Sequence, residues 1–194
     1  MTPTQRVLAA CTLTLALAAC QQEAPQPAAT APAPETPEIT VGEGQGPQPV
    51  AEGSVVTGNE LAMVASDPRV QNWDGIGTRE AGRLVSNATN GYLMFGPKVP
   101  FEAGKYRVTV FGDVLTIAEG NKIVFDVTCN GVQQVFGKTE LDQTAKLGEN
   151  GELASWDVDV TAPVTDIEVR AFVTSGATVA ITRYEVKPAA AQAN

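Results

Sequence analysis

Apolar and polar side chains alternate in several short segments of the C-terminal two thirds of the chain. In residues 104–110, Tyr106, Val108 and Val110 are each separated by one polar side chain. The same period of two occurs in residues 123–129, 156–160 and 167–173. Because successive side chains of a β-strand point to opposite faces of a sheet, this period predicts strands with one buried and one exposed face.

Glycine-containing turns separate these segments at short intervals. They include Asp74-Gly75, Asn90-Gly91, Ala103-Gly104, Glu119-Gly120, Asn130-Gly131, Asn150-Gly151 and Ser175-Gly176. Asn130-Gly131 stands between two apolar segments and predicts a tight hairpin, since both residues readily adopt positive φ. Many short strands without an amphipathic helix between them predict an all-β fold, an antiparallel, jelly-roll-like β-sandwich, over residues 51–188.

The charge and the residue types of the chain narrow the possible functions. Its 194 residues contain 13 basic and 22 acidic side chains, a formal net charge of −9, and no histidine. A surface of this sign repels polyphosphate, so we do not expect a nucleic-acid partner. The absence of histidine excludes histidine-based catalytic triads and histidine-ligated metals. Neither G-x-S-x-G nor S-x-x-K occurs, and we expect a protein that is not an enzyme.

The N-terminus has the features of an export signal. Arg6 precedes the apolar run of residues 7–19, which is shorter than the ~20 residues that cross a bilayer. The run ends in Leu17-Ala18-Ala19-Cys20, which resembles the lipobox of bacterial lipoproteins. The resemblance implies that residues 1–19 are a signal peptide, that Cys20 becomes lipidated, and that Gln21 directs the lipoprotein to the outer membrane of the cell envelope.

The residues after Cys20 predict a tether. Seven of the 13 prolines and four acidic residues, but no basic residue, fall in residues 21–50. Such a composition cannot bury a core, so we expect residues 20–50 to be a lipidated cysteine with a disordered, extended linker. Residues 189–194 are small and uncharged, and we expect a flexible tail there.

Within the predicted sandwich, several motifs resemble those of carbohydrate-binding modules. They are Gly75–Arg79, Gly91–Pro97, Phe101–Tyr106, Phe125–Gly131 and Ile167–Arg170, which together span most of residues 75–187. The resemblance implies a jelly-roll fold. It is weak for function, because glycines, prolines and alternating apolar positions are what this architecture needs mechanically and one architecture serves many ligands.

Aromatic side chains at outward positions are the candidate ligand-binding residues. Phe111 and Phe172 have the outward phase of their strands, Trp73 lies in a predicted loop, and Tyr92 lies close to the Gly96-Pro97 turn. The polar residues assigned to the same surface are Arg107, Arg170, Asp157 and Glu168. The alternative is that these rings are covered by a loop or by the second sheet.

The outward acids allow two interpretations. Asp126, Asp157, Asp159 and Glu168 could include a pair that hydrolyses a glycosidic bond. They could equally form a solvated face that keeps the domain soluble, with Arg107 and Arg170 as ion-pair partners. We favour the solvated face.

No cofactor is expected apart from a structural calcium ion. Its candidate ligands are Asp67, Asn72 and Asp74, or the loop of residues 149–152. Cys129 is the only cysteine in residues 51–188, and its inward phase predicts a buried, inert thiol.

These observations leave two functional hypotheses. The first is a lipid-anchored envelope protein that displays a non-catalytic binding module, with a glycan as the expected ligand. The alternative is a structural or assembly lipoprotein that binds another envelope protein through an apolar patch.

Overall fold

The computed structural model describes residues 52–190, which form one antiparallel β-sandwich. The predicted leader (1–19), Cys20 and the tether (20–50), and residues 191–194 of the predicted tail, lie outside the described residues. Within residues 52–190, the only helical element is the 3-10 turn Glu149–Gly151, and no helix is long and apolar enough to cross a bilayer. The all-β, jelly-roll-like prediction is confirmed.

The larger sheet has seven strands. They are β1 (Val55–Val56), β2 (Leu61–Val64), β3 (Gly77–Glu80), β4 (Arg83–Ser86), β7 (Gly104–Ile117), β10 (Glu152–Val160) and β12 (Ala177–Pro188). β12 pairs with β7 on one side, and its other side is shared by β2 and β4. β10 pairs with the free side of β7.

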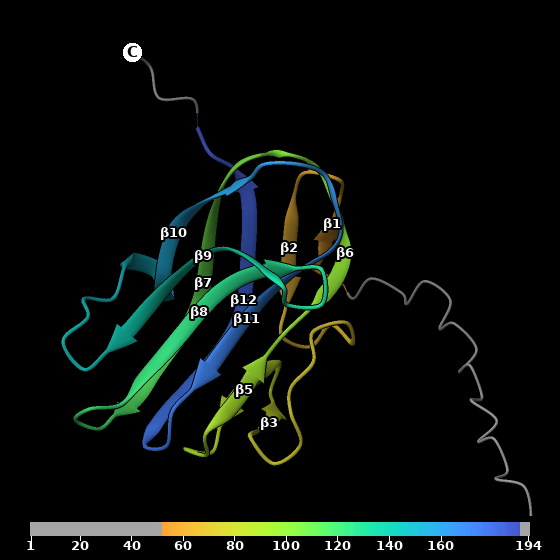
Figure 1. Cartoon of the computed structure of the whole chain (residues 1–194). Helices are drawn as coiled ribbons and strands as arrows, with labels where there is room; N and C mark the ends of the chain where they lie inside the picture. Colours follow the sequence, from red (N-terminus) through yellow and green to blue (C-terminus); the bar gives the residue numbers. More distant parts are fainter. Residues whose placement is uncertain (1–51, 191–194) are drawn as a thin grey trace, which may run out of the picture. The chain divides into compact units, whose positions relative to one another are not determined.

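The smaller sheet has five strands and lies in front of the larger one in Figure 1. They are β5 (Gly91–Met94), β6 (Pro97–Phe101), β8 (Lys122–Cys129), β9 (Gln134–Asp142) and β11 (Val164–Val173). β11 pairs with β8 on one side, while β6 and β5 share its other side in succession. β9 completes the sheet next to β8.

The hydrophobic core fills the space between the two sheets. Val108 and Val110 of β7, Val127 of β8 and Val169 of β11 are all 0% exposed, which confirms the inward phase predicted for these strands. Cys129 also faces the core, and its burial raises the pKa of its thiol. The predicted buried, inert cysteine is therefore confirmed as buried.

The hairpin predicted at Asn130-Gly131 joins β8 to β9, but its loop comprises residues 130–133 and is longer than the tight turn expected. Both residues have positive φ, 54° and 60°. The carboxylate of Asp166 accepts hydrogen bonds from their backbone N–H groups at 2.8 and 2.9 Å. These hydrogen bonds lower the pKa of Asp166 and fix the turn against the start of β11.

The loop between β2 and β3 is held by charged side chains. Asp67 is fully buried and binds the Arg69 guanidinium through both carboxylate oxygens, with distances of 3.0 and 2.8 Å. Arg79 of β3 reaches back and donates to the backbone carbonyls of Ala65 and Val70. The loop therefore has a defined conformation, which matters because it carries Trp73.

Candidate functional site

Three aromatic rings follow one another on the outer face of the five-stranded sheet. Trp73 and Tyr92 have ring centroids 5.0 Å apart, and Tyr92 and Phe172 have centroids 5.1 Å apart, both pairs edge to face. We call these three residues the aromatic row. Trp73 is 50% exposed, and the other two are half-buried.

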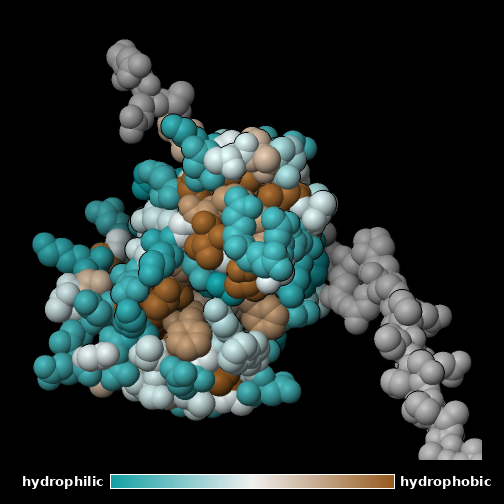
Figure 2. Space-filling model, viewed as in Figure 1, coloured by the Kyte–Doolittle hydropathy of each residue, from teal (hydrophilic) through white to brown (hydrophobic). Residues whose placement is uncertain are grey.

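The strands explain why these rings meet. Phe172 of β11 and Tyr92 of β5 are register neighbours, so their side chains leave the sheet on the same side. Trp73 comes from the loop before β3, and its backbone N–H donates to the carbonyl of Tyr92 at 3.0 Å. Figure 2 shows this side of the domain, where apolar side chains lie in separate areas among hydrophilic ones.

A buried ion pair adjoins the aromatic row. Arg170 of β11 lies opposite Asp126 of β8, and its Nε and Nη2 donate to the two carboxylate oxygens at 2.7 and 2.6 Å. The guanidinium carbon lies 4.7 Å from the centroid of the Tyr92 ring. The hydrogen bonds to Asp126 raise the pKa of Arg170. The charges of both groups are therefore compensated within the protein.

Glu168 and Thr128 form the next cross-strand pair, two residues further along the same face. They are 4% and 0% exposed, yet Glu168 Oε2 and Thr128 Oγ1 have no hydrogen-bond partner within residues 52–190. The third such buried atom in this part of the chain is Trp156 Nε1, whose ring packs against the core. Two of the three unsatisfied buried polar atoms thus lie beside each other on one face.

Several charged groups surround the Glu168 carboxyl. Burial raises the pKa of the Glu168 carboxyl above its ordinary value. The positive charges of Lys98 and Arg170 lower this pKa, and the negative charges of Asp126 and Asp166 raise it further.

The structure divides the predicted site residues between two faces. Trp73, Phe172, Arg170 and Glu168 lie together, with Tyr92, on the five-stranded sheet. The remaining predicted site residues, Phe111, Arg107 and Asp157, lie in β7 and β10 of the seven-stranded sheet.

The expectation that Phe111 and Phe172 share one surface is therefore wrong. The period of a strand distinguishes inward from outward positions but does not say which sheet the strand joins. On its own face Phe111 is covered by Arg183, whose guanidinium carbon lies 3.5 Å from the ring centroid. Arg107 and Asp157 form an exposed ion pair at 2.6 Å.

Sequence reasoning missed Thr128 and Lys98 as members of the site. Thr128 has the same outward phase as Asp126, which was a usable signal. Its burial and lack of a partner depend on the neighbouring strands, which the period of β8 does not specify. Lys98 gave no signal, because it stands in a strand without alternation.

The candidate calcium ligands do not converge. Asp67 is bound to Arg69, and the Asn72 side chain donates to the backbone carbonyls of Trp73 and Gly77 at 3.1 and 3.4 Å. Across residues 52–190, no group of three acidic, histidine or cysteine side chains is arranged to hold a metal ion, the loop of residues 149–152 included.

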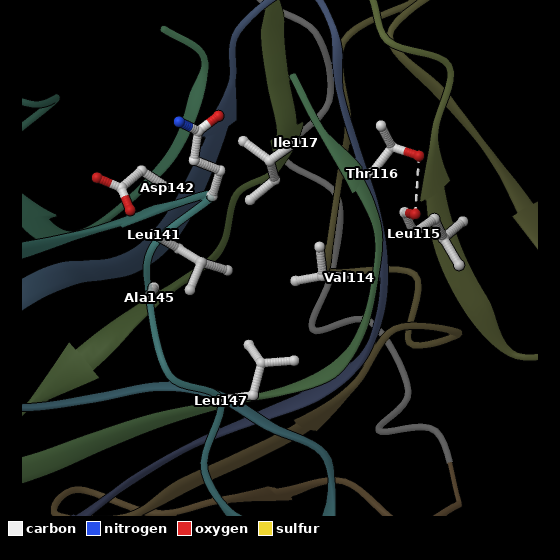
Figure 3. A pocket seen from close by; sticks show the side chains of 9 residues that line it. Val114, Leu115, Thr116, Ile117, Leu141, Asp142, Ala145 and Leu147 are labelled. Carbon is white, nitrogen blue, oxygen red and sulfur yellow. Dashed lines mark hydrogen bonds between the residues drawn. The ribbon is translucent and has the colours of Figure 1, made fainter. Parts of the chain in front are cut away.

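A separate apolar pocket of about 280 Å³ lies between the end of β7 and the chain after β9. Val114 and Ile117 point toward Leu141 and Leu147 across it, whereas Leu115 points away (Figure 3). Six aliphatic side chains line the pocket together with Thr116, Asp142 and Gln143, and none of its lining side chains is aromatic.

The fold and this face define the chain as a β-sandwich module with an aromatic and polar outer surface. No protein-family model matches the sequence, and no curated protein sequence matches it. One similar solved structure is the C-terminal CBM6 of LamC, a marine laminarinase from Zobellia galactanivorans, with 16% identity and a TM-score of 0.42, covering 66% of this chain and 99% of that chain. Another is the K1 cleaved adhesin domain of Lys-gingipain from Porphyromonas gingivalis W83, with 14% identity and a TM-score of 0.36, covering 71% and 95%.

Proposed function

We propose that this domain is a non-catalytic module that binds a glycan on the outer face of its five-stranded sheet. One observation carries the proposal: the three rings of the aromatic row follow one another on the outer face, and Trp73 at its end is 50% exposed. Aromatic rings contact the apolar C–H face of a pyranose, and polar side chains beside them bind its hydroxyls. The combination suits an uncharged, polyhydroxylated ligand.

The arrangement of the acids supports binding rather than hydrolysis. Glycoside hydrolysis needs two carboxyl groups that face one substrate, one of them as acid and the other as base or nucleophile. Asp126 is committed to Arg170 at 2.6 Å, and Asp157 and Asp159 lie on the other sheet. Of the other acids of this sheet, Glu168 is 4% exposed, Asp166 accepts hydrogen bonds from the Asn130-Gly131 turn, and Glu140 is paired with Lys122 at 2.8 Å.

We further propose that the module is tethered to the cell envelope, at the outer membrane, through lipid on Cys20. The support comes from the sequence, where a lipobox-like Leu17–Cys20 precedes a proline-rich segment without basic residues. One acyl chain gives only marginal anchoring, whereas the several chains of a lipoprotein hold the protein stably. The tether would then hold the domain clear of the membrane.

The ligand proposal is tested with the full chain, purified in a sugar-free detergent, on a glycan array followed by calorimetric titration of the hits. The double variant Trp73→Ala/Tyr92→Ala should lose binding by tens of fold, at about 1 kcal/mol for each ring. Phe111→Ala on the opposite face is the matched control and should bind as the unmodified protein does. Failure to retain any glycan, or equal loss in the control, would refute the proposal.

The anchoring proposal is tested by cell fractionation of Cys20→Ser. The variant should lose its membrane-bound mature form and accumulate as an uncleaved precursor. Cys11→Ser, in the apolar run, is the control and should fractionate like the unmodified protein. A membrane-bound pool of mature size in the Cys20 variant would contradict lipidation at this residue.

A second function, binding of another envelope protein, is favoured by the apolar pocket at the end of β7. Leu115 and Leu147 beside it are 54% and 50% exposed, and exposed apolar side chains that lie together are typical of protein interaction surfaces. If no glycan binds, crosslinking in cells with photoreactive side chains at these two positions tests for a protein partner.

A further inference from the structure

We propose that Asn150 is a site of spontaneous deamidation, and that the fold protects the two other asparagine–glycine pairs of the chain, Asn90-Gly91 and Asn130-Gly131. The inference is independent of the proposed glycan-binding function. The three pairs have the same local sequence, and the structure gives each a different hydrogen-bonding and packing environment. Their chemical stability should differ accordingly.

Deamidation of an asparagine requires no reactant other than water. The backbone nitrogen of the next residue forms a bond to the asparagine Cγ, the bond from Cγ to the side-chain nitrogen breaks, and ammonia leaves with the backbone proton. Water then opens the resulting cyclic imide to aspartate or isoaspartate, with no change in oxidation state. A following glycine favours the first step, because it has no Cβ to hinder the nitrogen and its backbone rotates readily.

Asn150 is the middle residue of the exposed turn Glu149–Gly151, and Gly151 supplies the reacting nitrogen. The backbone of Asn150 is in the left-handed region, with φ 56° and ψ 32°. Within residues 52–190, the Asn150 side chain has no hydrogen-bond partner, and no side chain of another element binds the turn. The turn can therefore rearrange to bring the side chain to the Gly151 nitrogen without breaking a side-chain contact.

The Asn130-Gly131 pair is also exposed, but its reacting nitrogen is engaged. The Gly131 N–H donates to Oδ2 of Asp166 at 2.9 Å, and the Asn130 N–H donates to Oδ1 at 2.8 Å. Ring closure would break both charge-assisted hydrogen bonds, and the ionised carboxylate opposes loss of the Gly131 amide proton. Because the same hydrogen bonds lower the pKa of Asp166, this carboxylate stays charged at neutral and alkaline pH.

Packing protects the Asn90-Gly91 pair. Asn90 is exposed, but Gly91 is buried at the start of β5 and pairs with Val173 of β11. A Cβ added to Gly91 would lie 2.6 Å from Cδ1 of Ile76 and 3.3 Å from the Trp73 ring, so the backbone has no space around it. Ring closure has to rotate the peptide between the two residues, which would displace the first residue of β5 from these contacts.

Deamidation of Asn150 would alter one side of the apolar pocket. The Gly148 N–H donates to the Glu152 carbonyl at 2.9 Å and closes the turn directly after Leu147, which lines the pocket. Isoaspartate lengthens the backbone inside this turn by a methylene group, so the closing hydrogen bond cannot keep its geometry. Either product also adds a carboxylate between Glu149 and Glu152, which repels both.

The test is peptide mapping by mass spectrometry of the full chain in detergent, incubated at 37 °C at pH 7.4 and at pH 9. Trypsin places the three pairs in separate peptides, residues 84–98, 123–138 and 147–170. In the folded protein, Asn150 should deamidate about tenfold faster than Asn90 and Asn130, the factor that one charge-assisted hydrogen bond provides. The rate at Asn150 should be higher at pH 9, because the attacking nitrogen must lose its proton. In concentrated urea all three should react at similar rates, since glycine follows each of them.

Asp166→Ala tests the cause of the protection. It should accelerate deamidation of Asn130 about tenfold and leave the rates at Asn90 and Asn150 unchanged. Asp157→Ala, which removes an exposed acid of the other sheet, is the matched control and should change none of the three rates.

Equal rates at the three pairs in the folded protein would overturn the proposal, and so would an Asn130 rate that Asp166→Ala leaves unchanged. If Asp166→Ala accelerates Asn90 as well, the variant has opened the whole domain. The order of the three rates in the unmodified protein, folded and in urea, then decides: a faster Asn150 that loses its lead in urea supports the proposal, and any other order overturns it.

Discussion

The two outer faces of this sandwich obey the same alternating pattern but differ in how their polar groups are satisfied. On the seven-stranded sheet, charged side chains are paired at or near the surface: exposed Arg107 with Asp157, and half-buried Glu185 with both Arg183 and Lys187. On the five-stranded sheet, Arg170 and Glu168 are buried, and Glu168 keeps an oxygen without a partner. One face pairs its charged groups near the surface, whereas the other keeps a buried carboxylate oxygen without a partner within residues 52–190.

The comparison shows why residue type alone does not reveal a binding face. Both faces carry an arginine, an acid and an outward phenylalanine. They are Arg107, Asp157 and Phe111 on one side and Arg170, Asp126 and Phe172 on the other. The two faces differ in burial. On the five-stranded sheet, the ion pair of Arg170 with Asp126 is held largely away from water, and buried Glu168 keeps a carboxylate oxygen without a hydrogen-bond partner.

The largest expected effect comes from breaking the buried ion pair. Asp126→Asn leaves the Arg170 guanidinium buried without its counter-charge, and we expect a loss of about 3 kcal/mol in the free energy of unfolding. Asp157→Asn removes the partner of an exposed arginine and should cost less than about 1 kcal/mol. Urea denaturation of the two variants measures both values. Equal losses would mean that the two faces do not differ in the way described.

A smaller effect, of opposite sign, is expected for Glu168→Gln. Because burial raises the folded-state pKa of Glu168, the folded state of the unmodified protein holds this proton more tightly than the unfolded chain. The contribution of the protonated Glu168 carboxyl to the free energy of unfolding is therefore present at low pH and is lost as the pH rises through the raised pKa. The glutamine variant avoids this loss, so it should be more stable above that range, by about 1 kcal/mol at pH 8, with no advantage at pH 4.

Thermal melting of both proteins from pH 4 to pH 8 checks this expectation. Glu185→Gln on the other sheet loses its partners Arg183 and Lys187 and should be slightly less stable at neutral pH. A stability difference for the Glu168 variant that does not vary with pH would show that its carboxyl titrates normally.

The smallest effect concerns salt. Exposed ion pairs such as Arg107 with Asp157 are screened at high ionic strength, so 1 M sodium chloride should change their contribution by only a few tenths of a kcal/mol. The buried pair of Arg170 with Asp126 should be unaffected. A double-mutant cycle for each pair, at low and high salt, measures both coupling energies. A strong salt dependence of the buried pair would indicate that water reaches it.

The sequence predicted the inward and outward phase of four strands well and the partners of the strands poorly. Tyr106, Val108 and Val110 had the correct inward phase because the period of a strand is a local property. The Asn130-Gly131 hairpin was equally local. The sheet that each strand joins depends on pairings between segments far apart in the chain, such as β7 with β12, and no local pattern encodes them.

The candidate site was predicted in part for the same reason. Trp73, Phe172, Arg170 and Glu168 were named from their outward or loop positions, and they do lie together. Their proximity arises from the register of β5, β8 and β11 and from a backbone hydrogen bond that brings the Trp73 loop to β5. The burial of Glu168 depends on these same neighbours, so its outward phase alone predicted exposure.

The fixed loop that carries Trp73 has a consequence for the entropy and speed of recognition. Its turn is held from within by Asp67 and Arg69 and from β3 by Arg79, and its far end pairs with β5. The indole is therefore ordered before any ligand arrives, and complex formation does not have to immobilise the loop. We expect a preorganised site of this kind to associate without a slow conformational step, so that affinities for different ligands are set by how fast each one dissociates.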